Sequence, residues 1–139
     1  MEFCRALVVD DHPVNQELLS FVLEEEGFEV RTAPCAEEAL TLAAQFQPDV
    51  LILDVQLPGM SGLELTRELR KRPAHRQACI VIVTSYAMEC DREQAFEAGC
   101  DGYITKPIDT RTFAAEVLGF MKERTKDLTV ASGSLSIRR

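Results

Sequence analysis

The residues DVLILD at positions 49–54 decide the fold of this chain. They form an apolar run that ends in a carboxylate, without the alternation of polar and apolar residues that is typical of a half-exposed strand. Such a run indicates a strand buried on both faces, as in a parallel sheet that is covered by helices on both sides. RALVVD at 5–10 and CIVIVT at 79–84 have the same character.

Helical segments separate these apolar runs along the chain. Apolar residues recur in them at helical spacing, and Gly27, Pro48 and Gly99 stand where segments should end. Strand and helix therefore alternate five times, which predicts an α/β fold with right-handed crossovers and a parallel sheet. The expected strands are Arg5–Asp10, Phe28–Thr32, Asp49–Asp54, Cys79–Thr84 and Gly102–Thr105, and the expected helices are Pro13–Gly27, Ala36–Phe46, Gly62–Lys71, Met88–Ala98 and Asp109–Arg124.

The chain of 139 residues has the length of one domain, which we place at residues 4–124. The remaining residues, Thr125–Arg139, are rich in Ser, Thr and Gly and lack helical periodicity. We therefore expect them to form a flexible tail or the stub of a linker.

Charge and cysteine content narrow the range of functions. The formal net charge is −8 and the isoelectric point is about 4.8. A polyanion of this kind is not expected to bind nucleic acid or an anionic membrane surface directly. No apolar run approaches the roughly 20 residues that span a bilayer. The five cysteines are odd in number and widely spaced, which favours reduced thiols in a cytoplasmic protein over a disulfide framework.

Polar side chains stand where the expected strands end. Asp10 and Asp11 follow the first strand, Asp54 ends the third, Thr84 ends the fourth, and Lys106 follows the fifth. Each residue alone has an ordinary structural explanation, such as a helix cap or a surface charge. Ligands of open parallel sheets bind beyond the carboxyl ends of the strands, so we expect these side chains to converge at one edge.

Clustered carboxylates repel one another unless a proton or a cation joins them. A site made of oxygen donors favours a hard ion, Mg²⁺ or Mn²⁺, over zinc, and the single neighbouring His12 is weak evidence for a transition metal. A carboxylate beside such an ion can attack a phosphoryl group and form an acyl phosphate, with a nearby Lys and a hydroxyl stabilising the phosphoryl oxygens. The arrangement is therefore competent to capture a phosphoryl group.

Four blocks of this sequence resemble the receiver domain of two-component response regulators. They are VVDDHPVN at 8–15, LILDVQLPGMSGLEL at 51–65, IVTSYAM at 82–88 and GCDGYITKP at 99–107. The resemblance covers roughly residues 4–124 and is most similar to stand-alone receivers and to those fused to hybrid histidine kinases. It implies a single doubly wound, flavodoxin-like (βα)5 domain with the strand order 2-1-3-4-5.

The resemblance also implies a role for each site residue. Asp54 would be the phosphoacceptor, and Asp11, Asp54 and the backbone carbonyl of Gln56 would bind Mg²⁺ (or Mn²⁺), with Asp10 acting through water. Thr84 would hydrogen-bond the phosphoryl group, and Lys106 would pair with it or with Asp54. Tyr103 would be the switch aromatic, and the peptide bond between Lys106 and Pro107 would be cis.

The partners that the resemblance implies are a histidine kinase or a histidine phosphotransfer protein. A downstream protein would bind the face formed by the fourth helix, the fifth strand and the fifth helix. The chain would then be a switch that assists only its own phosphorylation and dephosphorylation, not an enzyme with a separate substrate. The resemblance is also compatible with a dimer that forms on phosphorylation.

Two other functions fit parts of the same pattern. The first is a metal-dependent phosphatase with Asp54 as its nucleophile, although the haloacid-dehalogenase type needs a second acid where Gln56 stands. The second is a receiver that binds partners without being phosphorylated. The presence of all three acids, Asp10, Asp11 and Asp54, argues against it. Turnover of a phosphate ester would favour the phosphatase, and one phosphoryl group per chain would favour the switch.

The first helix is more apolar than a surface helix requires. Leu19, Val22 and Leu23 suffice for one buried stripe, and a second stripe follows at helical spacing beside the acidic pair. This second stripe is either more of the core or a docking surface for the helical domain of a kinase or phosphotransfer protein. Its residues are Val14, Leu18 and Phe21.

Overall fold

A computed structural model describes residues 4–85 and 89–132, with the backbone alone for residues 89 and 125–132. Strands and helices alternate along these residues as the sequence predicts. The strands are β1 (Arg5–Val9), β2 (Glu29–Ala33), β3 (Val50–Asp54), β4 (Cys79–Thr84) and β5 (Gly102–Thr105). The helices are α1 (Pro13–Glu25), α2 (Ala36–Phe46), α3 (Gly62–Lys71), the short 3₁₀ helix η1 (Pro73–His75), α4 (Glu89–Ala98) and α5 (Phe113–Ser132).

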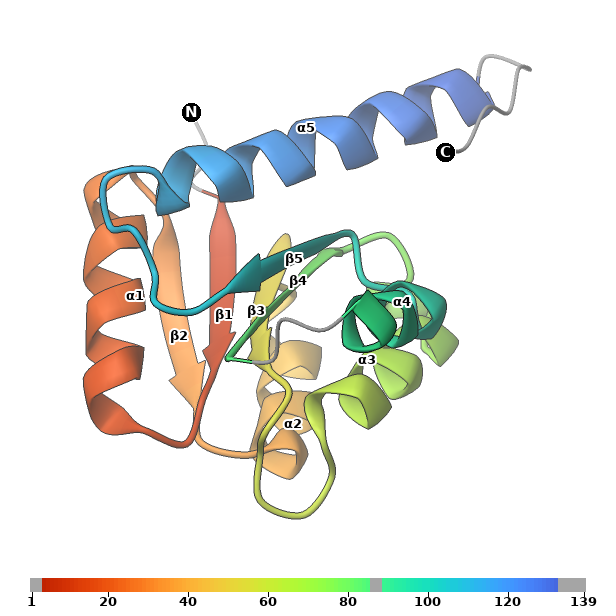
Figure 1. Cartoon of the computed structure of the whole chain (residues 1–139). Coiled ribbons are helices and arrows are strands. Elements are labelled where there is room, and N and C mark those ends of the chain that lie inside the picture. Colours follow the sequence, from red (N-terminus) through yellow and green to blue (C-terminus); the bar gives the residue numbers. More distant parts are fainter. Residues whose placement is uncertain (1–3, 86–88, 133–139) are drawn as a thin grey trace.

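The strands form one parallel sheet in the order β2-β1-β3-β4-β5 (Figure 1). In the register of the central strand β3, Leu53 pairs with Val9 of β1 and with Ile82 of β4. Every residue of β3 and β4 is buried. The doubly wound α/β fold is therefore confirmed, including the strand order.

Helices cover both faces of the sheet and divide the core into two layers. On one face α1 and α5 pack against the sheet, and Leu23 and Phe113 are among the fully buried side chains of that layer. On the other face α2, α3 and α4 pack through small or branched residues such as Ala39, Leu65 and Ala95. Figure 1 shows the strands lying between these two groups of helices.

The start of α3 is built against the carboxyl end of β3. The Ser61 hydroxyl accepts a hydrogen bond from the backbone N–H of Glu64, and the Glu64 carboxylate accepts one from the backbone N–H of Ser61. This capping box fixes where the helix begins. A Cβ atom at Gly62 would overlap the backbone carbonyl of Asp54, so only glycine allows this close approach.

The last helix differs from the sequence-based expectation at both ends. It begins at Phe113 and not at Asp109, because the Asp109 carboxylate accepts a hydrogen bond from the backbone N–H of Arg111 and closes a turn there. It continues past Arg124 to Ser132, so the first part of the expected tail is helical. The rest of that tail lies outside the described residues, as does Met88, the expected start of α4.

Two further expectations concern the whole chain. All five cysteines are free thiols, as their spacing predicts. Among the described residues no helix combines the length and the apolar character needed to cross a membrane.

An ion network joins four elements at the edge of the sheet opposite to the strands' carboxyl ends. The Asp101 carboxylate lies 2.7 Å from the guanidinium of Arg70 in α3 and 2.8 Å from that of Arg124 in α5, and it accepts the backbone N–H of Ile80 at 2.9 Å. Burial holds the pKa of Arg70 below its ordinary value, and the Asp101 charge opposes this shift. The network therefore anchors α3 and α5 to the strands β4 and β5.

Replacing Asp101 with alanine should lower the free energy of unfolding by about 3 kcal/mol, because both arginines would keep largely buried charges without their acidic partner. Urea unfolding followed by circular dichroism measures this change. Asp109→Ala is the matched control, since Asp109 pairs with Arg111 on the exposed surface. An equal effect of the two substitutions would contradict a structural role for the network.

Candidate functional site

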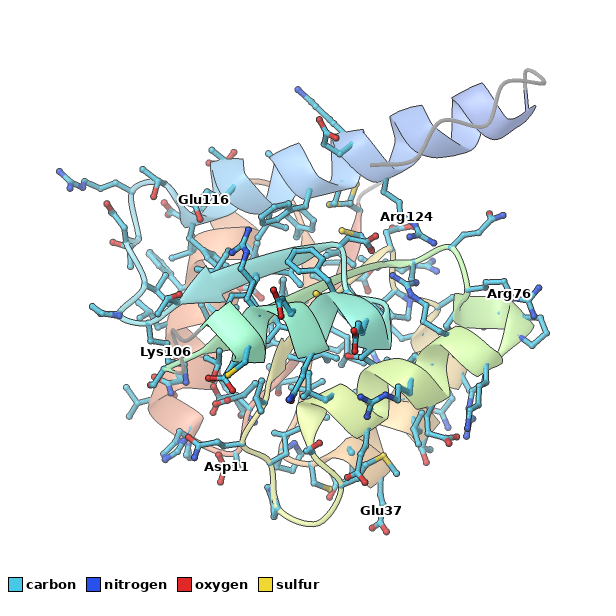
Figure 2. All side chains as sticks on the ribbon, turned by 45° about the vertical axis from the view of Figure 1, so that its right-hand side comes forward. Asp11, Glu37, Arg76, Lys106, Glu116 and Arg124 are labelled. Atoms are coloured by element: carbon cyan, nitrogen blue, oxygen red, sulfur yellow. The ribbon has the colours of Figure 1, made fainter. Side chains whose placement is uncertain are left out.

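The predicted polar residues converge at the carboxyl edge of the sheet. Asp10 follows Val9, the last residue of β1, and Asp54 pairs with Val83, one residue before Thr84. Lys106 follows β5, and its backbone N–H donates to the carbonyl of Thr84 at 2.8 Å. Figure 2 shows Lys106 and Asp11 at one end of the molecule, with Arg76 and Arg124 at the opposite end.

The Lys106 ammonium joins two buried carboxylates. Its Nζ lies 3.0 Å from Oδ2 of Asp54 and 3.5 Å from Oδ2 of Asp10. Asp10 is 2% exposed and Asp54 is 6% exposed, so both would repel each other in a weakly polar surrounding without this cation. The peptide bond between Lys106 and Pro107 is cis, as expected.

Backbone N–H groups hold the second oxygen of each buried carboxylate. Oδ1 of Asp54 accepts from the N–H of Gln56 at 3.0 Å, and Oδ1 of Asp10 accepts from the N–H of His12 at 2.9 Å. The side-chain amide of Gln16 donates to the backbone carbonyl of Asp10 at 2.5 Å. Each carboxylate is therefore fixed in orientation by the loop that follows its strand, which prepares it for binding or attack.

Asp11 lies at the exposed rim of the site, beside His12. Nδ1 of His12 is 3.0 Å from Oδ1 of Asp11 and 3.4 Å from Oδ1 of Asp10. These three side chains form a group in which one donor atom from each lies within 4.8 Å of the others. A single histidine beside two acids is a weak signal in the sequence, and the contact of His12 with both acids is visible only in the structure.

Three further predicted residues lie on β4, on β5 and in the loop after β3. Thr84 is fully buried at the end of β4, while Gln56 is exposed in the loop after β3. Tyr103 of β5 is 8% exposed and pairs with Ile82 of β4. Arg92 of α4 was not predicted from the sequence, and its guanidinium lies 5.8 Å from the centre of the Tyr103 ring. No local sequence pattern indicates this contact, because it depends on how α4 packs beside β5.

The donor set suits a divalent cation. Carboxylates and backbone carbonyls are the ligands that Mg²⁺ prefers, and Asp10, Asp11, Asp54 and Gln56 offer them within the two loops at this edge. Two buried carboxylates with one shared ammonium leave negative charge at the edge, which favours a cation there. These residues therefore fit the expected metal.

Comparison with known proteins agrees with the geometry. The sequence model of the response regulator receiver domain matches residues 6–118. The chain is 34% identical over 115 residues to the polar-differentiation response regulator DivK of Brucella ovis, which covers 83% of this chain and 94% of DivK.

The chain belongs to the response regulator receiver family. Solved structures of similar proteins superpose closely on this receiver domain. A crystal structure of a putative response regulator from Chloroflexus aurantiacus gives a TM-score of 0.83 at 33% identity and covers 87% of this chain and 99% of its own. The chemotaxis protein CheY4 of Vibrio cholerae gives 0.82 at 27% identity and covers 86% and 99%.

The second apolar stripe of α1 is exposed in this receiver domain. Val14 is 74% exposed, Phe21 is 60% exposed and Leu18 is 39% exposed, so the interpretation of this stripe as core is wrong. A groove of about 210 Å³ runs from Leu18 to Lys106 and Ile108. The stripe therefore continues directly to the rim of the acidic site.

The pKa of the Lys106 ammonium lies above its ordinary value. Burial by itself would lower this pKa, but the hydrogen bond to Asp54, the charge of Asp54 and the charge of Asp10 together outweigh it. A group whose pKa is raised on folding stabilises the folded state as long as it is protonated in both states. This stabilisation is complete below the pKa of the unfolded chain, about 10.4, and is lost as the pH rises through the folded pKa.

Lys106→Met should therefore lower the free energy of unfolding by about 2 kcal/mol at pH 8, because two carboxylates lose the cation between them. The difference between the two proteins should shrink as the pH rises above about 10.4. Urea unfolding of both proteins at several pH values between 8 and about 11.5 measures it. A difference that stays constant over this range would contradict the pairing.

Proposed function

We propose that this receiver domain is a phosphorylation switch whose Asp54 accepts a phosphoryl group from a histidine kinase or a histidine phosphotransfer protein. The observation that carries the proposal is the placement of Asp54, a buried carboxylate 3.0 Å from the Lys106 ammonium and beside the acidic pair Asp10 and Asp11. A carboxylate so fixed can act as a nucleophile, and a cation beside it can stabilise the phosphoryl oxygens.

The proposed step transfers one phosphoryl group. A carboxylate oxygen of Asp54 attacks the phosphorus atom, the bond between phosphorus and the donor's imidazole nitrogen breaks, and that nitrogen keeps the electron pair and takes up a proton. The product is an acyl phosphate on Asp54. Lys106 then pairs with a phosphoryl oxygen and the Thr84 hydroxyl donates to another, so this chain's own groups bind the new charge.

The divalent cation of the proposal is Mg²⁺, with Mn²⁺ as the other candidate. Asp11, Asp54 and the backbone carbonyl of Gln56 would hold it, and Asp10 would contribute through water. When bound, the ion neutralises negative charge on the attacking carboxylate and on the phosphoryl oxygens. The backbone N–H of Gln56 holds one oxygen of Asp54 in place, and that of His12 holds one oxygen of Asp10.

The output of the proposed switch would pass through Thr84 and Tyr103. When Thr84 turns toward the phosphoryl group, the packing between β4 and β5 changes, and Tyr103 responds as the second part of a two-state element. In this structure Tyr103 is buried, with Arg92 of α4 over its ring. Burial also raises the pKa of the Tyr103 hydroxyl, with a further contribution from the charge of Asp91. The face of α4, β5 and α5 would then bind a downstream protein. A dimer that forms on phosphorylation would require a surface whose packing phosphorylation changes.

The acceptor role has a direct test with a small phosphodonor. With Mg²⁺ and acetyl phosphate the wild type should gain one phosphoryl group per chain, stable in acid and labile to alkali and hydroxylamine, because an acyl phosphate forms. Asp54→Asn should gain none at that position, as an amide is not a competent nucleophile. Intact-mass spectrometry and phosphate release after hydroxylamine treatment measure both results.

Asp49→Asn is the matched control, since Asp49 stands at the other end of β3 and its carboxylate accepts the backbone N–H of Arg5. It should label as the wild type does. Labelling of Asp54→Asn to the wild-type level would overturn the proposal. Catalytic turnover of p-nitrophenyl phosphate by the wild type would instead favour the phosphatase, and partner binding without any labelling would favour the phosphorylation-independent receiver.

The docking surface of the phosphodonor is the exposed stripe of α1. Val14, Leu18 and Phe21 lie on one face of the helix, and Leu18 lines two grooves, one toward Lys106 and one of about 410 Å³ toward α5. A helical donor domain laid along this stripe would bury these apolar side chains and place its histidine beside Asp54. Apolar anchors would supply affinity, and closeness to the carboxyl edge would supply reactive geometry.

Leu18→Ala and Phe21→Ala should therefore slow phosphotransfer from the cognate kinase by about tenfold or more, since an exposed apolar anchor contributes more than about 1.4 kcal/mol to such a complex. Labelling by acetyl phosphate should stay intact. Melting temperatures should change little because both side chains are exposed. Radiolabel transfer from the phosphorylated kinase measures the rate.

Phe96→Ala on α4 is the matched control, because Phe96 is 40% exposed and lies outside the α1 stripe. It should leave transfer from the kinase unchanged. Should the α1 variants unfold readily, or lose labelling from both donors equally, the stripe has a structural role and the docking proposal fails.

A further inference from the structure

We infer that Nδ1 of His12 is an additional ligand of the divalent cation, so that the site prefers a first-row transition ion such as Mn²⁺ over Mg²⁺. The inference deepens the proposed function, because it concerns the cation of the same site. It adds a nitrogen donor to a set of ligands that otherwise consists of oxygen atoms.

The spacing of the donor atoms supports this assignment. Ligand atoms about 2.1 Å from one cation lie about 3.0 Å apart at neighbouring octahedral positions and about 3.4 Å apart at tetrahedral ones. Nδ1 of His12 is 3.0 Å from Oδ1 of Asp11 and 3.4 Å from Oδ1 of Asp10. The imidazole nitrogen therefore already stands at ligand spacing from both acids.

The His12 side chain makes no helix-capping hydrogen bond that metal binding would have to break. His12 is the N-cap residue of α1, yet its side chain makes no capping hydrogen bond, and its backbone N–H alone holds Asp10. The side chain is 68% exposed, so it can adjust toward an ion at little cost in packing. A serine or aspartate, the usual residue at an N-cap, would supply a capping oxygen that histidine does not.

The two oxygens of Asp10 face different nitrogen groups. Oδ2 faces the Lys106 ammonium at 3.5 Å, and Oδ1 faces the His12 imidazole at 3.4 Å. Lys106 therefore lies on the side of the site that holds Asp54, the proposed phosphoacceptor. His12 and Asp11 lie at the exposed rim. An ion at this rim can bind His12 without displacing Lys106 from Asp54.

The chemistry of the donors sets the preference. Mg²⁺ prefers oxygen ligands and keeps several waters, whereas imidazole nitrogen is a good ligand for the first-row transition ions, with affinity rising from Mn²⁺ along the series to Cu²⁺. One imidazole added to two or three carboxylates should therefore raise affinity for Mn²⁺ far more than affinity for Mg²⁺. His12 thereby determines which cation this receiver takes.

The experiment uses Mn²⁺ as the probe and the complete chain, with and without ¹⁵N-labelled histidine. The chain holds two histidines, and the other one, His75, is buried in η1 before β4, at the opposite edge of the sheet. Electron spin echo spectra of bound Mn²⁺ should show a directly coordinated imidazole nitrogen whose signal changes with the label. His12→Gln should remove this signal.

Affinity gives a second readout that needs no phosphorylation. Mn²⁺ binding, measured from the signal of the free ion, should weaken about tenfold or more in His12→Gln. Mg²⁺ binding, measured by competition, should change less than about twofold, because its ligands remain oxygen atoms. Glu17→Gln is the matched control on the exposed surface of α1, and it should leave both affinities and the nitrogen signal unchanged.

Bound Mn²⁺ without a label-sensitive nitrogen signal, or equal losses of Mn²⁺ and Mg²⁺ affinity in His12→Gln, would overturn the inference. Either result leaves the phosphorylation switch intact if Asp54 still labels with acetyl phosphate and Mg²⁺. Conversely, a histidine-bound Mn²⁺ in a protein whose Asp54 never labels would contradict the proposed function and keep the role of His12.

Discussion

The contact between the Lys106 ammonium and the carboxylates of Asp54 and Asp10 is the constraint on which the site depends. A parallel sheet brings its strand ends to one edge, and here that edge carries two buried acids that would repel each other without a cation. Their second oxygens are held by backbone N–H groups of the following loops. The two carboxylates are thus held close together, fixed in orientation and only partly neutralised. This arrangement suits the binding of a divalent ion and the attack of a carboxylate on a phosphoryl group.

The opposite edge of the sheet supplies the rigidity that this site needs. Asp101 joins Arg70 of α3 to Arg124 of α5 and also accepts the backbone N–H of Ile80. These bonds fix the start of β5, and Lys106 stands just past the end of the same short strand. A strand anchored at one end can transmit a change at its other end as a shift in packing, and Tyr103, under Arg92, lies between the two.

The two sides of α1 show how one helix serves packing and recognition together. Leu19, Val22 and Leu23 pack against the sheet, while Phe21 stays exposed and Leu18 lines a groove that leads to Lys106. His12, at the start of the same helix, faces the acidic pair. In the proposed switch this helix would carry a partner surface along its length and a metal donor at its N-cap, so that donor docking and cation choice meet at one place.

The sequence by itself determined the alternation of strands and helices, because apolar runs and helical spacing are local patterns that record burial. It also determined which strand ends carry Asp10, Asp54, Thr84 and Lys106, and the family blocks supplied the strand order. Tertiary structure alone decided the rest. The exposure of Phe21 and the position of Arg92 over Tyr103 depend on how the helices pack against the sheet. The position of His12 against both acids depends on the conformation of the loop between β1 and α1. Local sequence sets which face of a helix is apolar, but packing against the sheet decides how much of that face is covered.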